Sequence, residues 1–266
     1  MNGAPCVLSQ RDGAWLTLWL NRPESRNALS VELIVDLTAA LGSARDDRSI
    51  RGITLRGKGG TFCAGGDLKG FREITSGGKT VEEVTDISIA GAELFRLVQT
   101  MPQVVVALVE GAAMAGGLGM ICAADMVAVT RDAKFALTET MIGIPPAQIA
   151  PYVVGRIGLA EARRIMLTGA RFDGAEAARI GIANVAVDDV AGLDSFEAEV
   201  RRGVLRCAPG ANAMTKEILL AAQGVSADDL PRFAGERFAR CLLGEEGREG
   251  VASFLEKRKP AWAAEA

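Results

Sequence analysis

Two glycine-rich segments in this chain could place backbone N–H donors around a reacting group. They are Phe62-Cys-Ala-Gly-Gly-Asp-Leu68 and Gly111-Ala-Ala-Met-Ala-Gly-Gly-Leu-Gly119, and each follows an apolar run typical of a buried strand. Glycine has no Cβ, so a ligand can approach the backbone N–H groups of such a segment closely. Two segments of this kind could direct two N–H donors at one oxygen atom, which stabilises negative charge on a carbonyl oxygen.

Glu139 is the candidate for proton transfer. It lies in the apolar stretch from Phe135 to Pro145, where burial would raise the pKa of its carboxyl group and suit it to proton transfer near neutral pH. Taken alone, such a glutamate is more often a solvated residue at a strand end or a partner of arginine. The glycine segments also have plain structural readings, a surface turn at 62–68 and a closely packed helix at 111–119.

Composition narrows the chemistry further. The 266 residues include no histidine, which excludes Ser-His-Asp and Cys-His catalysis and every metal site built on histidine, and we expect no metal ion. Acid–base work then falls to carboxylates, lysine, tyrosine or cysteine. The five cysteines form no C-x-x-C pair, so they favour reduced thiols in a cytoplasmic protein.

Charge and hydropathy predict no nucleic-acid or membrane partner. The net charge is −3, so no strong positive field would attract a nucleic acid or an anionic lipid surface. The chain also has no uninterrupted apolar run of about 18 residues, the length that would indicate a membrane span.

The elements that must position these residues alternate between strand and helix. Apolar runs predict strands at residues 15–20, 51–56, 104–109, 126–129 and 184–187. Ser30 is a plausible cap for a first helix, Ile87 to Met101 mark one face of a long helix that ends at Pro102, and Asp173 has capping-box spacing with Glu176. Apolar strands that alternate with helices imply parallel pairing and an α/β core.

The chain changes character near its C-terminal quarter. From about residue 195 the sequence is helical in pattern, with breaks at Pro209-Gly210, Gly224 and Gly244–Gly247. We therefore expect a core at residues 1–195, which contains the site, and a helical subdomain at residues 196–266.

One alternative for the second glycine segment is a dinucleotide-binding turn. Gly117-x-Gly119-x-x-Cys122 follows a strand and has Glu139 about 20 residues later. Cys122 takes the third position, where a glycine or alanine normally allows close packing of helix on strand. This makes nicotinamide or flavin binding the weaker interpretation.

The chain resembles the crotonase superfamily of enoyl-CoA hydratases and isomerases along essentially its whole length. The resemblance rests on four ordered motifs: Asn21-Arg-Pro-Glu-Ser-Arg-Asn-Ala-Leu29, Phe62–Leu68, Val109–Gly117 and Phe135-Ala-Leu-Thr-Glu139. It implies a spiral of ββα units with a C-terminal helical trimerisation subdomain, and assembly as a homotrimer or a dimer of trimers. It also implies an acyl-CoA substrate, carried as a coenzyme A thioester, and no tightly bound cofactor.

The resemblance assigns a role to each site residue. Gly66 and Gly116 would hold the thioester oxygen, and Glu139 would transfer protons. The remaining residues would bind the substrate or its CoA moiety: Arg26, Ala28, Ala64, Gly65, Asp67, Leu68, Gly117, Phe254 and Lys257, the last two from a neighbouring subunit or their own. For Lys257 the plain alternative is a solvated basic helix end.

Gly119 departs from the pattern of many hydratases in this superfamily, which have a second catalytic glutamate at that position. Narrower similarities, in Gly143–Val154, Ala170–Asp173 and Cys207–Ala213, are to the hydratases of 3-substituted glutaconyl-CoA esters, isohexenylglutaconyl-CoA hydratase first and methylglutaconyl-CoA hydratase next. The expected reaction is hydration of such a 2-enoyl thioester, with the space beside Gly119 accommodating a branched β-carbon. The alternatives are a Δ3,Δ2-enoyl-CoA isomerase, for which one glutamate suffices, and a non-catalytic binder.

Overall fold

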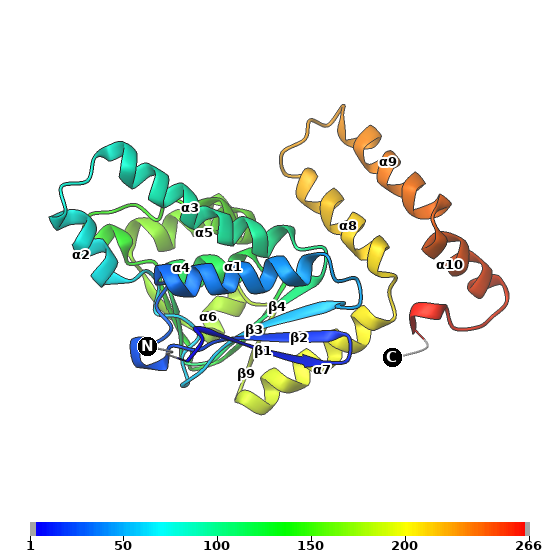
Figure 1. Ribbon diagram of the computed structural model, residues 1–266, viewed down its shortest axis with the longest axis horizontal. Coiled ribbons are helices and arrows are strands. Elements are labelled where there is room, and N and C mark those ends of the chain that lie inside the picture. Colours follow the sequence, from blue (N-terminus) through cyan, green and yellow to red (C-terminus); the bar gives the residue numbers. More distant parts are fainter. Residues whose placement is uncertain (1–3, 264–266) are drawn as a thin grey trace.

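A six-stranded sheet forms the centre of the computed structural model, which describes residues 4–263 (Figure 1). In spatial order its strands are β1 (Val7–Asp12), β2 (Trp15–Leu20), β3 (Gly52–Gly57), β4 (Val104–Val109), β6 (Met126–Thr130) and β9 (Val185–Val187). Only β1 pairs antiparallel to its neighbour, and the other pairings are parallel, as the strand–helix alternation predicts.

Both faces of the inner strands β2, β3, β4 and β6 are buried, which explains why these strands are mostly apolar, whereas the edge strand β1 is polar and largely exposed after Val7. Val105 and Val109 of β4 pack into the larger cluster with α1 (Val31–Arg45), α3 (Val81–Thr100), α4 (Gly116–Ala123) and α5 (Ala150–Thr168). Val106 and Leu108, which point to the other face, pack with Leu193 of α7 (Val190–Leu205). Alternate residues of one strand therefore support two separate layers of helices.

Two predicted helix caps are present, although the Glu176 side chain pairs with Arg164 and Arg179 and does not complete the capping box with Asp173. Ser30 caps α1 by accepting from the Leu33 N–H at 3.3 Å, and Asp173 caps α6 (Gly174–Arg179) by accepting from the Glu176 N–H at 3.0 Å. The long helix around Ile87–Met101 is present as α3, but Ile87 is 43% exposed, because only the second half of α3, around Leu94 and Val98, lies against the core.

A small second sheet lies beside the first. It comprises β5 (Ala112–Met114), β7 (Lys134–Ala136) and β8 (Arg171–Asp173), with β5 and β7 parallel. The short helices η1 (Pro23–Ser25), α2 (Leu68–Ser76) and η2 (Glu139–Ile142) follow β2, the first glycine-rich segment and β7.

The C-terminal helices form an arm that extends away from the sheet (Figure 1). They are α8 (Pro209–Ala221), α9 (Leu230–Leu243) and α10 (Glu245–Leu255), followed by η3 (Ala261–Ala263). Residue 195 lies within α7, and α7 packs on the sheet through Leu193 and Val204. The division of the chain at residue 195 stays a prediction. Within residues 4–263, no helix combines the length and the apolar character needed to cross a bilayer.

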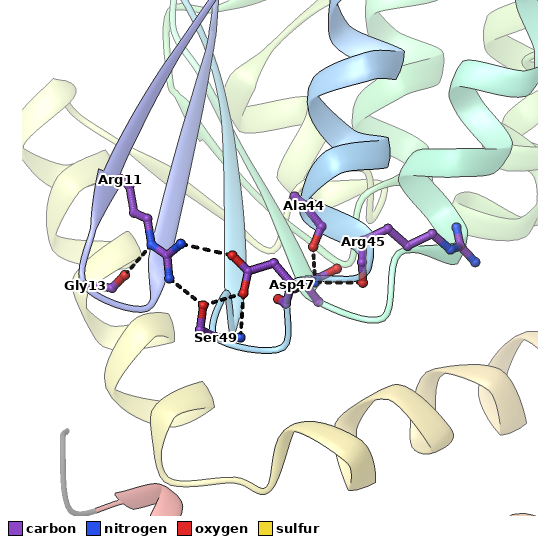
Figure 2. Close-up of polar contacts among 7 residues, drawn as sticks. Arg11, Gly13, Ala44, Arg45, Asp47 and Ser49 are labelled. Atoms are coloured by element: carbon purple, nitrogen blue, oxygen red, sulfur yellow. Dashed lines mark hydrogen bonds and ion pairs between the residues drawn. The ribbon is translucent and has the colours of Figure 1, made fainter.

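The loop between α1 and β3 is cross-linked by polar contacts at the end of the sheet (Figure 2). Arg11 contacts Asp47 at 3.0 Å and donates to the Ser49 hydroxyl at 2.6 Å. The buried Gln103 side chain donates to the Ala44 carbonyl at 2.6 Å, and so satisfies an acceptor at the C-terminal end of α1.

A buried ion pair attaches the arm to this end of the core. Lys216 Nζ of α8 lies 2.5 Å from Asp125 Oδ2, and the two side chains are only 12% and 25% exposed. Lys216 also donates to the Gln103 carbonyl at 2.7 Å, and Asp125 accepts from the Val105 N–H at 2.7 Å. Burial raises the pKa of Asp125 and lowers that of Lys216, while each partner's charge opposes that shift.

Replacing one member of this pair should destabilise the protein strongly. We expect Lys216→Met to lower the free energy of unfolding by about 3 kcal/mol, because it leaves a buried carboxylate without its counter-ion. Lys216→Met/Asp125→Asn should recover much of that loss, and urea denaturation measures both. The exposed pair Arg232–Glu236 is the control, since its loss should cost at most about 0.5 kcal/mol. Equal losses in the single and double variants would contradict the ion-pair interpretation.

Candidate active site

The two glycine-rich segments lie side by side. Cys63 pairs with Ala113 as an isolated parallel bridge, and the Cys63 N–H donates to the Ala112 carbonyl at 3.0 Å. The Met114 N–H donates back to the Cys63 carbonyl at 2.9 Å. Backbone pairing therefore fixes the register of the first segment against β5, just before Gly66 in one segment and Gly116 in the other.

Leu29 links the two glycines that the sequence assigned to the oxyanion hole. Its N–H donates to the Gly65 carbonyl at 2.8 Å, and its backbone forms a bridge with Gly66. A Cβ on Gly116 would lie 2.7 Å from Leu29 Cδ1, and one on Gly66 would lie 2.9 Å from Phe71 Cζ. A side chain at either position would therefore require the Leu29 or Phe71 side chain to move.

Both glycine N–H groups are available to a ligand. Within residues 4–263, neither the Gly66 nor the Gly116 N–H donates a hydrogen bond to another protein group. Gly116 is the first residue of α4, whose first hydrogen bond runs from the Gly119 N–H to the Ala115 carbonyl at 3.0 Å. The free N–H groups at a helix start carry partial positive charge, which favours a negatively charged oxygen.

The turn before α4 is held in an uncommon conformation. Ala115 has φ 48° and ψ −119°, a region that residues with a Cβ rarely occupy. Its N–H donates to the Ala136 carbonyl of β7 at 2.9 Å, which stabilises the turn from which α4 begins. Backbone strain of this kind is frequent where structure is organised around a ligand.

Glu139 lies at the same edge of the small sheet. Met114 and Ala136 are register partners at the ends of the parallel strands β5 and β7, and Glu139 begins η2 three residues later. Its Oε2 atom is buried and, among the described residues, has no hydrogen-bond partner. Burial raises the pKa of this carboxyl group, while its own backbone N–H lowers it to a smaller extent. The arrangement provides a carboxyl group that can take up and release a proton.

The residues assigned to the CoA moiety are brought together by the loop 26–28. The Ala64 N–H donates to the Arg26 carbonyl at 2.9 Å, so Arg26 and Ala28 lie beside Ala64–Leu68. Asn27 is completely buried, and its Nδ2 donates to the Lys58 and Thr61 carbonyls at 3.0 and 2.7 Å. Its Oδ1 accepts from the Arg22 N–H at 2.8 Å. Asn27 therefore connects this loop to the strand-end loop that leads into the first glycine segment.

Of the remaining predicted residues, Gly65, Gly117, Asp67 and Leu68 lie at the site, whereas Phe254 and Lys257 lie in the arm. Gly65 and Gly117 are buried in the contact between the segments, Asp67 caps α2 by accepting from the Lys69 N–H at 3.0 Å, and Leu68 is exposed. Phe254, 84% exposed, and Lys257 are at the end of α10, in the arm on the opposite side of the molecule from α2 (Figure 1). Within one chain these two residues do not join the site.

The expectation of free space beside Gly119 is wrong. A Cβ on Gly119 would lie 2.2 Å from Ile149 Cγ2, so the buried Ile149 side chain already fills the volume that a side chain at 119 would use. Ile149, Leu29 and Phe71 were not assigned roles from the sequence. Their apolar types carry no chemical signal, and only their contacts with glycines mark them.

Comparisons with known proteins agree with this geometry. The family model described as enoyl-CoA hydratase/isomerase matches residues 11–265. The chain belongs to the enoyl-CoA hydratase/isomerase family. Its fold is accordingly that of the crotonase superfamily, and the predictions of the superfamily, the fold and an enzymatic activity are confirmed.

Individual relatives of the family cover nearly the whole chain. The structure of AtuE from Pseudomonas aeruginosa is 44% identical, with a TM-score of 0.93, over 97% of this chain and 99% of that one. A Thermus thermophilus protein assigned to the enoyl-CoA hydratases is 35% identical over 91% of this chain and 95% of its own length. The mevalonyl-coenzyme A hydratase sidH of Aspergillus fumigatus is 30% identical over 97% of this chain and 94% of its own length.

Removing the Asn27 side chain should destabilise the site without touching its chemical groups. Asn27→Ala leaves two partly buried carbonyls and one N–H without their partner, and we expect the free energy of unfolding to fall by about 3 kcal/mol. Chemical denaturation measures this loss. Asn21→Ala is the matched control, because Asn21 makes only an exposed side-chain bond to the Pro5 carbonyl. Similar losses for both variants would show that the buried network is unimportant.

Proposed function

We propose that this enzyme adds water to the double bond of a 2-enoyl-CoA thioester. The observation that carries the proposal is the buried, unpartnered Oε2 of Glu139 at the same sheet edge as the free N–H groups of Gly66 and Gly116. An unpaired buried carboxyl oxygen is costly for stability, which favours a role in binding or catalysis over a structural one.

In the proposed mechanism, the N–H groups of Gly66 and Gly116 donate to the thioester oxygen. Polarisation of the thioester makes the β-carbon electrophilic. Water attacks that carbon and the π electrons move onto the oxygen as an enolate, while Glu139 accepts a proton from the water. The enolate collapses as Glu139 returns a proton to the α-carbon, so a single carboxyl group completes the cycle. Two aligned N–H donors contribute about 10²–10³ in rate each.

The substrate class we propose is a 3-substituted glutaconyl-CoA, with an isohexenyl or a methyl group on carbon 3. It rests on the sequence similarities at 143–154, 170–173 and 207–213. The relative named as a mevalonyl-coenzyme A hydratase supports it, since mevalonyl-CoA is itself branched at carbon 3. Comparing turnover of crotonyl-CoA with that of 3-methylglutaconyl-CoA and 3-isohexenylglutaconyl-CoA tests the assignment, and a preference for crotonyl-CoA would contradict it.

The CoA moiety is proposed to lie along Arg26, Ala28 and Ala64–Leu68, with no tightly bound cofactor or metal ion. Phe254 and Lys257 would contribute from a neighbouring subunit.

The arm supports assembly as a homotrimer or dimer of trimers, because it leaves large apolar side chains exposed: Leu219, Phe238, Leu242, Leu243, Val251, Phe254 and Leu255. Light scattering coupled to size exclusion measures the assembly.

Glu139→Gln should remove catalysis and keep the fold. We expect kcat to fall by about 10²–10⁴, because glutamine cannot carry the proton, with acyl-CoA binding retained. Burial disfavours the charged carboxylate, so at neutral pH the variant should be at least as stable as the wild type. Glu82→Gln, on the exposed first turn of α3, is the control. Wild-type turnover in Glu139→Gln would refute the assignment.

The rate should also depend on pH through Glu139. Water activation needs the carboxylate, and burial raises the pKa of this group above its ordinary value. The rate should therefore increase with pH and level off only above the range of an ordinary glutamate. A kcat profile across acidic and neutral pH measures this limb. A limb at the ordinary glutamate position would show that Glu139 is not buried in the working enzyme.

The single carboxyl group also suits a Δ3,Δ2-enoyl-CoA isomerase, which moves a proton between two carbons. Separate incubations with a 3-enoyl-CoA and with its 2-enoyl isomer in ¹⁸O-labelled water distinguish the two activities. The hydratase predicts ¹⁸O in a 3-hydroxyacyl product formed from the 2-enoyl ester. A 2-enoyl product without ¹⁸O, and no hydration of added 2-enoyl ester, would establish the isomerase instead.

A further inference from the structure

The contact between Gly119 and Ile149 joins α4 to the segment that carries Glu139. A Cβ on Gly119 would lie 2.2 Å from Ile149 Cγ2 and 2.5 Å from Ile149 Cβ. Real side chains do not approach so closely, and the branched carbon of Ile149 is part of the overlap. Rotation of the Ile149 side chain alone therefore cannot make room, and the backbone at 149 must move if position 119 gains a methyl group.

Ile149 is the one buried residue of the segment 139–149. Glu139, Pro146 and Gln148 are half-buried, and the remaining residues of the segment are exposed. The segment makes further contacts: Thr140 donates to the Met166 carbonyl at 3.3 Å, Gln148 donates to the Ser88 hydroxyl at 3.0 Å, and the Met141 side chain packs beside Gly169. Ile149 is thus the most deeply buried apolar side chain that holds this segment against the core.

The segment between Ile149 and Glu139 is short and internally bonded. The Ile144 N–H donates to the Glu139 carbonyl at 3.1 Å, and the Ala150 N–H donates to the Pro146 carbonyl at 3.2 Å. Pro145 and Pro146 further restrict the backbone between these bonds. A displacement at Ile149 should therefore be transmitted to Glu139 with little loss in the intervening loop.

We infer that Ile149, seated on the bare Cα of Gly119, is a positioning residue that sets how deeply the Glu139 carboxyl group enters the site. This inference rests on the proposed role of Glu139. It also gives Gly119 a function of its own. The absence of a side chain at Gly119 lets Ile149 pack against α4, and it does not provide space for the substrate. Gly116 and Gly119 lie one turn apart on α4, so the same short helix would hold the thioester oxygen and the proton carrier in register.

Gly119→Ala is the principal test. The added methyl group should push the 139–149 segment outward, lower kcat by about 10- to 100-fold through misplacement of Glu139, and leave KM little changed. As Glu139 becomes more exposed, its pKa should fall, and the acidic limb of the pH–rate profile should move to lower pH. A folded Gly119→Ala variant with wild-type kcat and an unmoved acidic limb would overturn the inference.

Gly203→Ala is the matched control, because Gly203 lies within α7 and a Cβ there would meet no atom within 4 Å. It should leave kcat, KM and the pH profile unchanged. Circular dichroism and thermal denaturation establish that each variant is folded before kinetics are compared.

A pair of substitutions at Ile149 keeps the test decisive if Gly119→Ala does not fold. Ile149→Val keeps the branched carbon that contacts Gly119, whereas Ile149→Leu removes Cγ2 at nearly constant volume. We expect Ile149→Leu to lower kcat and shift the acidic limb of the pH–rate profile. Ile149→Val should keep both kcat and the acidic limb close to those of the wild type. Equal kinetics for the two variants would contradict the inference.

The double variant Gly119→Ala/Glu139→Gln separates this inference from the proposed function. If Gly119 acts through Glu139, the alanine should add no further loss once Glu139 is gone. Full additivity would overturn the positioning role and leave the hydratase proposal intact. Wild-type turnover in Glu139→Gln alone would instead remove the proposed function.

Discussion

The pairing of two short backbone segments is the constraint on which the site depends. Cys63 and Ala113 form a parallel bridge, and the bonds on either side of it hold the first glycine segment in register with β5. Neither segment has regular structure long enough to fix Gly66 or Gly116 by itself. Their position relative to each other comes from this contact, from the Ala115–Ala136 bond that ties the second segment to β7, and from Leu29, which touches both. The parallel sheet supplies the common edge at which all of these chain segments end.

At this edge of the sheet, three glycines allow apolar side chains to pack directly against the backbone of the site. Leu29 Cδ1 lies against Gly116, the Phe71 ring lies against Gly66, and Ile149 lies against Gly119. At each glycine, an apolar neighbour occupies the side on which a side chain would otherwise lie. Low polarity around a preorganised donor strengthens its interaction with a developing charge. Burial raises the pKa of Glu139, so reduced polarity would assist both the oxyanion donors and the proton carrier.

Much of the fold and part of the site could be predicted from the sequence. Apolar runs predicted five strands of the large sheet to within about a residue at each end, but not the edge strand β1, whose residues after Leu8 are polar. The Ser30 and Asp173 caps are local signals that tertiary contacts did not override. Packing between distant parts of the chain could not be predicted from the sequence. Ile87 has helical spacing with Leu94, but Ile87 lies in the first half of α3, which projects beyond the core, and so it stays exposed. The space beside Gly119 could not be assigned either, since Ile149 is 30 residues away and its contact follows from the path of a loop that has no regular period.

The account depends most on two backbone N–H groups polarising one carbonyl oxygen. Isotope-edited infrared spectroscopy tests this directly, with an enoyl-CoA that carries ¹³C at the thioester carbonyl bound to the slow Glu139→Gln variant. Hydrogen bonds from Gly66 and Gly116 should lower the carbonyl stretching frequency below its value for the same thioester in water. A bound carbonyl at or above the frequency seen in water would contradict the oxyanion hole, and with it the mechanism built upon it.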